Sequence, residues 1–256
     1  MNHRNPNNPL FRDRETVVYD DIDDCPYIRG NQMCTPMRYQ HRRLTAEEVD
    51  QSLALSDRRV GYMLYRPSCP NCNACEAIRI PVSDFKMSKS MRRILRKNKD
   101  IKVEIGPAIC DPQRIALYNR HKFERNLAST ERRMTAASYE GWLINTCVET
   151  KEFRYFLNDE LIGVSLIDFG ARDVSSVYFY FNPDHSDRSL GTFSALVEMQ
   201  WMKHREMRYY YLGLYVESCQ HLNYKSRYFP HERRVSGEWK RFENASVTRF
   251  DAPVVK

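Results

Sequence analysis

The chain has 256 residues, of which 42% are hydrophobic and 29% are charged. This composition is typical of a soluble globular protein, and the length suits one large domain or two smaller ones. The sequence contains no long uncharged apolar run and no apolar signal segment at its start, so we expect no membrane partner and a cytoplasmic location. The net charge of +7 favours a polyanionic partner, nucleic acid first, with a charged surface that only maintains solubility as the alternative.

In the first third of the chain, short predicted elements surround a cysteine-rich loop. Thr45 and Glu48 have the spacing of a capping box, which predicts a helix that ends near Ser56. Residues 62–65 and 77–82 are predicted to form strands that pair with each other across the loop.

The loop itself carries three closely spaced thiols. Cys69, Cys72 and Cys75 form two overlapping C-x-x-C units, and Cys25 lies upstream. Four thiolates suffice for a tetrahedral zinc site or an iron–sulfur cluster, and disulfides are not expected in a reducing compartment. The sequence therefore predicts a metal site on these four residues, with reduced thiols that hold no metal as the alternative.

A basic helix is predicted next, over residues 88–98. Arg92, Arg93 and Arg96 lie on its polar side, opposite apolar residues that would face the core. These arginines could position the phosphates of a nucleic acid, or they could form an ordinary solvated face. Further on, a strand is expected over 101–105, a helix from Asp111 to about 126, and another over 135–147.

The second half of the chain changes to a β-rich pattern. Strands are predicted over 153–157, 161–169 and 174–181, followed by a helix over 190–207 and a strand over 209–215. Three antiparallel strands, a helix and a further strand is the element order of the GNAT acyltransferase core. We therefore expect an α+β protein with a Cys-rich N-terminal subdomain, residues 1–110, and a GNAT-like domain, residues 111–256, in which helices flank an antiparallel sheet.

Several polar residues stand at the ends of these elements. Arg188 and Gly191 fit the phosphate-binding turn of GNAT enzymes, but Phe193 stands where a small residue would let CoA approach. Asp168 ends a strand and could accept a proton or hold an ammonium group, or it could simply cap the following turn. Lys225 could contact a phosphate or a carboxylate.

The chain resembles the arginyl-tRNA–protein transferase family in the order and content of its motifs. The first half carries Arg58-Arg59-Val60-Gly61, Tyr65-Arg66-Pro67-x-Cys-x-x-Cys-x-Ala-Cys and Ile78-Arg79-Ile80-Pro81-Val82; the second carries Asn182-Pro183-Asp184, Arg188-Ser189-Leu190-Gly191-Thr192 and Asn223-Tyr224-Lys225. It is similar to the bacterial branch. That similarity implies transfer of leucine from Leu-tRNA to proteins that begin with Asp or Glu, which marks them for degradation, with arginyl transfer to the same termini as the alternative.

This resemblance leads to specific expectations for the site. An aminoacyl ester is already activated, so no cofactor is required for the chemistry, and an acidic acceptor needs fixed cations gathered in one cleft. The predicted catalytic residues are Asp168, Tyr178 and Lys225; the predicted substrate-binding residues are Arg58, Arg59, Arg66, Arg79, Arg188 and Tyr180; the predicted tRNA-binding residues are Arg92, Arg93 and Arg96. A CoA-dependent N-acetyltransferase and a non-catalytic tRNA-binding module are the other functions considered.

Overall fold

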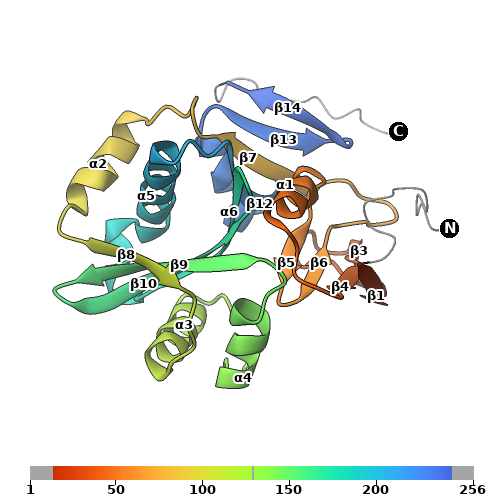
Figure 1. Ribbon diagram of the computed structural model, residues 1–256, viewed down its shortest axis with the longest axis horizontal. Helices are drawn as coiled ribbons and strands as arrows, with labels where there is room; N and C mark the ends of the chain where they lie inside the picture. The colour runs from red at the N-terminus through yellow and green to blue at the C-terminus, as the bar shows by residue number, and fades with distance from the viewer. Residues whose placement is uncertain (1–13, 129, 244–256) are drawn as a thin grey trace.

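The computed structural model describes residues 14–128 and 130–243 (Figure 1). Among these residues, eight strands form one large sheet, in which β11 and β12 are parallel neighbours and the other neighbouring strands are antiparallel. The strand order is β14 (Glu238–Phe242), β13 (His231–Val235), β7 (Glu76–Pro81), β12 (Tyr209–Tyr215), β11 (Asp173–Phe181), β10 (Glu160–Phe169), β9 (Glu149–Leu157) and β8 (Lys102–Pro107). The prediction of a mixed fold with a mostly antiparallel sheet is confirmed.

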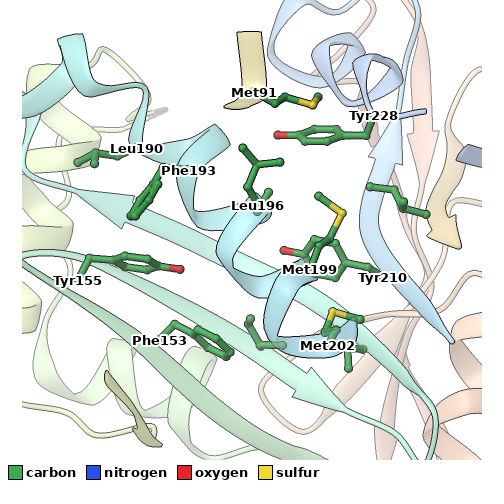
Figure 2. Close-up of a cluster of buried hydrophobic side chains, with 14 of the residues drawn as sticks. Met91, Phe153, Tyr155, Leu190, Phe193, Leu196, Met199, Met202, Tyr210 and Tyr228 are labelled. Atoms are coloured by element: carbon green, nitrogen blue, oxygen red, sulfur yellow. The ribbon is translucent and has the colours of Figure 1, made fainter. Parts of the chain in front are cut away.

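Helices cover both faces of the large sheet. Figure 1 shows α2 (Lys89–Lys97) and α5 (Leu190–His204) on one face, and α3 (Pro112–Glu124) and α4 (Ala136–Tyr139) on the other. The first face encloses an apolar cluster of buried residues to which α5 contributes Leu190, Phe193, Leu196, Met199 and Met202 (Figure 2). Burial of these large side chains is the main force that holds the helix on the sheet.

Two smaller sheets precede the large one. The first has the order β1 (Glu15–Tyr19), β4 (Met37–Gln40), β6 (Met63–Tyr65) and β5 (Arg58–Val60), and the second pairs β2 (Ile22–Asp24) with β3 (Gln32–Cys34). Helix α1 (Ala46–Ala54) begins with the predicted capping box, in which Thr45 and Glu48 bond to each other's backbone amides. The short helical segments are a π-helix, Glu140–Ile144, two 3₁₀ segments, Pro183–Arg188 and Tyr224–Arg227, and α6 (Gln220–Asn223).

One prediction about strand pairing differs from the structure. The strands on either side of the cysteine loop do not pair: β6 lies between β4 and β5, whereas β7 lies between β13 and β12. The reason is burial, because residues 77–81 of β7 are all buried and need a sheet neighbour on each side. Since β7 and β8 share a sheet with strands after residue 110, the proposed division at that residue does not coincide with a sheet boundary and stays a prediction.

Most predicted helices and strands are confirmed, with two differences. The helix expected over 135–147 is a short α-helix continued by a π-helix and ends at Ile144. The charged hairpin of β13 and β14 was not predicted, because its strands are rich in Arg, Glu and Lys instead of the usual β-branched residues. No helix in the described part of the chain is long and apolar enough to cross a membrane.

Candidate active site

The large sheet opens at the junction of its two parallel strands. β11 and β12 pair over three residues only, ending at Ser175 opposite Tyr211, and then diverge. A cavity of about 860 Å³ lies between the diverging strands, the start of α5 and the segment from 220 to 228. We call it the fork cleft. Beyond the fork, each strand has an edge with no strand partner among residues 14–128 and 130–243, which leaves backbone groups available to a ligand.

Arg58 reaches into the fork cleft from β5. Its guanidinium donates to Ser175 Oγ at 2.8 Å and to the backbone oxygen of Ser176 at 2.9 Å. On the opposite strand, Gly213 has a φ of +87°, and a Cβ at this position would lie 3.0 Å from Arg58 Cζ. Glycine is therefore required here both by the backbone conformation and by the close approach of the guanidinium.

Lys225 approaches the same fork from the side of β12. Its Nζ donates to the backbone oxygen of Leu214 at 2.6 Å, and the side chain is buried. Burial, and secondarily the charge of Arg58, lowers the pKa of Lys225 to about 7. This amine can therefore exchange a proton near neutral pH, as catalytic lysines do.

The mouth of the cleft next to α5 carries a second guanidinium. Arg125 lies 3.4 Å from Nε2 of His121 and 4.8 Å above the Phe181 ring. The backbone amide of Phe181 donates to Nδ1 of His121, and burial lowers the pKa of this histidine to about 4, so the ring is neutral at pH 7. No carboxylate within residues 14–128 and 130–243 forms an ion pair with Arg125 or with Arg58, so both charges remain available to an anion.

Two predicted site residues pair with each other outside the fork cleft. Arg59 donates to both carboxylate oxygens of Asp168, at 2.6 and 3.1 Å, and Thr150 donates to one of them at 2.7 Å. Both partners are buried. The structure thus places Asp168 against Arg59 and outside the lining of the fork cleft, because a buried carboxylate needs a cation and Arg59 supplies it; its catalytic role stays a prediction.

The other predicted arginines are also engaged. Arg79 bonds to Glu232 at 2.7 Å, Arg66 to Asp57 at 2.8 Å, and Arg188 to Asp100 at 2.9 and 3.0 Å. None of these three lines the fork cleft, and Tyr180 instead bonds to Tyr139 on the face that α3 and α4 cover. The structure therefore does not bring these three arginines together in the fork cleft, and each has its own carboxylate partner; their role in substrate binding stays a prediction.

The four predicted metal-binding cysteines line a separate cavity. Cys25, Cys69, Cys72 and Cys75 border a space of about 600 Å³, which shares Tyr27, Tyr65 and Leu214 with the wall of the fork cleft. Burial raises the pKa of Cys75 to about 12, so this thiol is protonated. Within the described part of the chain, no three His, Cys, Asp or Glu side chains are grouped closely enough to hold a metal ion.

The basic helix forms as predicted and lies close to the cleft. α2 keeps Met91 in the core while Arg92, Arg93 and Arg96 are exposed. Its last turn is fixed to the segment before α5, since Lys97 bonds to Asp187 and Asn98 donates to the backbone oxygen of Arg188. That segment leads into Ser189, Leu190 and Gly191 at the cleft wall, so the last turn of α2 lies next to the fork cleft.

Of the predicted site residues, Arg58, Tyr178 and Lys225 line the fork cleft. Sequence reasoning did not identify His121, Arg125 and Glu198, which line it as well. One usable signal was present for the last of these: a glutamate within the apolar run Ala195-Leu196-Val197-Glu198-Met199 marks a charge on the buried side of a helix.

Comparison with known proteins identifies relatives along most of the chain. Residues 113–235 match the family described as arginine-tRNA-protein transferase, C terminus, and residues 23–93 match its N terminus. The chain is 34% identical over 220 residues to an aspartate/glutamate leucyltransferase of Aeromonas hydrophila, covering 86% of this chain and 92% of that protein. A protein of the same name from Marinobacter nauticus is 30% identical, covering 85% and 92%.

Solved structures resemble the chain only distantly. The structure of L-PGS from Bacillus licheniformis aligns with a TM-score of 0.41 at 10% identity, over 56% of this chain and 47% of that one. This likeness is too weak to inform the fold or the function.

Proposed function

Because the chain belongs to the arginine-tRNA-protein transferase family, we propose that it transfers leucine from Leu-tRNA to the α-amino group of proteins that begin with Asp or Glu. We favour leucine as the transferred residue because relatives that cover most of the chain are named aspartate/glutamate leucyltransferase. Arginine is the alternative donor. The resulting N-terminal leucine would mark the acceptor for degradation, in the cytoplasm.

The main support for this proposal is the guanidinium of Arg58 at the fork, which has no carboxylate partner among the described residues. A carboxylate side chain that enters a half-buried site requires a cation that no protein carboxylate already neutralises. Arg58 meets this requirement, whereas Arg59, Arg66, Arg79 and Arg188 each hold a carboxylate partner. We assign Arg58 to the acidic side chain of the acceptor, and its two bonds to β11 hold the guanidinium in position for it.

Proton transfer is assigned to Lys225. In the reaction, the acceptor ammonium loses one proton, its nitrogen attacks the ester carbonyl, and the ribose hydroxyl leaves with the second proton. A lysine with a pKa of about 7 can take the first proton, as a general base near its operating pH should. The cation of Arg58 beside it keeps this amine from holding its proton too strongly. Tyr178 keeps its predicted catalytic role as a proposal, supported by its place in the cleft wall.

The tRNA is proposed to approach along α2. Arg92, Arg93 and Arg96 are exposed on this helix, and Arg125 adds a free charge at the mouth of the cleft. Phosphate contacts of this kind position a nucleic acid without reading its sequence. The start of α5 lines the cleft, and because the N-terminus of a helix favours an anion, we assign a terminal phosphate of the tRNA to this rim.

Two further assignments rest on the family and on element order. We propose a GNAT-like core for β9 to β12 with α5, supported by the sequence of three antiparallel strands, a helix and a parallel neighbour to the third strand. We propose the two domains, residues 1–110 and 111–256, on the same grounds.

A zinc ion or an iron–sulfur cluster on Cys25, Cys69, Cys72 and Cys75 is supported by their common cavity. Binding of either would require the thiols to move together and ionise.

A transfer assay tests the proposed function directly. The protein is incubated with Leu-tRNA or Arg-tRNA and a reporter peptide that begins with Asp, and the peptide mass is measured. We expect the mass to increase by one leucyl residue with Leu-tRNA. A gain of one arginyl residue instead would select the alternative donor, and an unchanged mass with both donors would refute aminoacyl transfer.

A further inference from the structure

The inner end of the fork cleft contains a buried carboxyl group that has no cation. Glu198 projects from α5 and is 1% exposed. Its Oε1 accepts hydrogen bonds from Ser194 Oγ at 2.5 Å and from the Tyr155 hydroxyl at 3.2 Å, and its Oε2 accepts one from Tyr210. Figure 2 shows the two phenol rings on either side of α5, with their hydroxyl groups directed toward the helix.

All these partners are neutral, which distinguishes Glu198 from other buried carboxylates of the fold. Asp168 and Glu152 are equally buried, but each has an arginine partner. Within residues 14–128 and 130–243 no cation forms an ion pair with Glu198, and burial raises the pKa of its carboxyl group. Burial without a countercharge disfavours the ionised form of this acid, so a cationic ligand would stabilise its carboxylate.

A second buried polar group borders the same end of the cleft. Ser165 is 1% exposed on β10 and lines the cleft, and its hydroxyl group lowers the pKa of the Glu198 carboxyl group through a hydrogen bond. A hydroxyl oxygen that donates its proton can still accept a hydrogen bond, so Ser165 Oγ can bind a donor in the cavity. Ser165 and Glu198 thus offer two acceptors to one donor group at the inner end.

The cleft therefore has opposite polarity at its two ends. Its mouth carries Arg125, and the last turn of the basic helix α2 is fixed to the segment that leads into the cleft wall, which suits phosphates; its inner end carries a carboxyl group without a cation. The acylated end of a charged tRNA has the matching polarity, because its phosphates lie at one end and the free α-ammonium of its amino acid at the other. Apolar residues between the two ends, Phe179, Ala195 and Leu212, would contact an aliphatic side chain.

We propose that Glu198, together with Ser165, binds the α-ammonium group of the donor aminoacyl residue and so selects donors with a free amine. This inference rests on the proposed function and specifies how its donor is held. The ammonium supplies the positive charge that the carboxylate lacks, and it fixes the ester carbonyl between the inner end and Arg58. Acyl groups without that amine, such as N-acetylated or hydroxy acids, are poor donors for the same reason.

The alternative is that Glu198 only ties α5 to β9 and β12 through its hydroxyl partners. In that case the carboxyl group would hold the core together and would not sense the donor. An assay that changes only the α-amino group of the donor aminoacyl residue distinguishes the two roles.

The experiment compares Leu-tRNA with the same tRNA carrying 2-hydroxy-4-methylpentanoate, in which a hydroxyl replaces the amine. Transfer to an Asp-initiated peptide is measured by mass. We expect the wild-type protein to prefer Leu-tRNA by roughly tenfold to a hundredfold, as loss of a charged hydrogen bond predicts. Glu198→Gln should use the two donors almost equally, while Glu206→Gln, a neutralisation at an exposed position just after the same helix, should keep the wild-type preference.

The outcomes assign failure to one proposal or the other. Wild-type protein that transfers both acyl groups equally would overturn the role of Glu198 but leave the proposed function intact, whereas transfer of neither would overturn the proposed function. A Glu198→Gln protein that keeps the wild-type preference would show a purely structural role. Should that variant not fold, Glu198→Asp serves instead: it keeps the charge but withdraws it by one methylene, and an unaltered donor preference would contradict the inference.

Discussion

Arg58 and Arg59 are neighbours in β5, yet they serve two regions of the molecule. Alternate side chains of a strand face opposite sides, so Arg58 enters the fork cleft while Arg59 enters the core beneath α1. Arg59 meets the buried carboxylate of Asp168, whereas Arg58 meets only a hydroxyl and a backbone oxygen. The comparison teaches that the partner, not the residue type, decides whether an arginine holds the fold or remains free for a ligand.

The largest difference between the two arginines should appear in the transfer rate. Arg58→Met removes the only proposed cation for the acceptor side chain, so we expect kcat/KM with an Asp-initiated peptide to fall roughly a hundredfold or more. Its free energy of unfolding should fall by only about 1–2 kcal/mol, for two lost hydrogen bonds. Arg188→Met, at the exposed pair with Asp100, is the matched control and should leave transfer nearly unchanged. Equal loss in both variants would contradict the distinction.

Arg59 should show the opposite effect. Arg59→Met leaves the carboxylate of Asp168 buried without its cation, so the free energy of unfolding should fall by about 3–5 kcal/mol in urea titrations. The double variant Arg59→Met, Asp168→Leu should recover most of this loss because no uncompensated charge remains. If instead the single variant were as stable as wild type and inactive, Arg59 would belong to the site.

The pH dependence should distinguish Lys225 from ordinary lysines. Its folded pKa of about 7 lies below the unfolded value, so between pH 7 and the usual lysine range the unfolded chain binds more protons. Stability from this group therefore rises with pH across that window and is lowest below pH 7. The transfer rate should also rise through about pH 7. Lys225→Met should flatten both profiles relative to wild type, measured by urea unfolding and by initial rates; unaltered profiles would exclude this lysine.

The smallest effect is expected on the surface of α2. Replacing Arg92, Arg93 and Arg96 by Ala should weaken tRNA binding and reduce the slope of log affinity against log salt by roughly 0.7–0.9 per lost phosphate contact. The three side chains are exposed, so thermal stability should hardly change. Fluorescence titrations with labelled tRNA at several salt concentrations measure the slope. A slope identical to that of wild type would place the tRNA elsewhere.

Local signals in the sequence predicted much of the fold. The capping box at Thr45, the N-cap at Asp111 and the strand–helix–strand pattern up to β12 were all visible in short windows. The pairing of β7 was not, because its neighbours β12 and β13 lie more than 120 residues further along the chain. No residue pattern close to β7 in the sequence predicts that β12 and β13 are its neighbours in the sheet.

The site was only partly predictable, for a related physical reason. Arg58 and Lys225 were identified from motifs, but the same reasoning also selected Arg59, Arg79 and Asp168, whose charges are neutralised by partners distant in sequence. In the sequence, an arginine that will pair with a carboxylate cannot be distinguished from one that will not, because folding brings the partners together. Glu198 was missed although its place in an apolar run was visible, because the run does not show whether folding supplies a cation partner.

The role of Arg58 can be measured most directly as a charge preference. Transfer to two peptides that differ only in Asp or Asn at the first position compares an acidic acceptor with its neutral isostere. We predict that the wild-type protein prefers the Asp peptide by roughly a hundredfold in kcat/KM and that Arg58→Met brings the ratio close to one. A ratio that stays at the wild-type value in Arg58→Met would contradict the assignment of the acidic acceptor to the fork cleft.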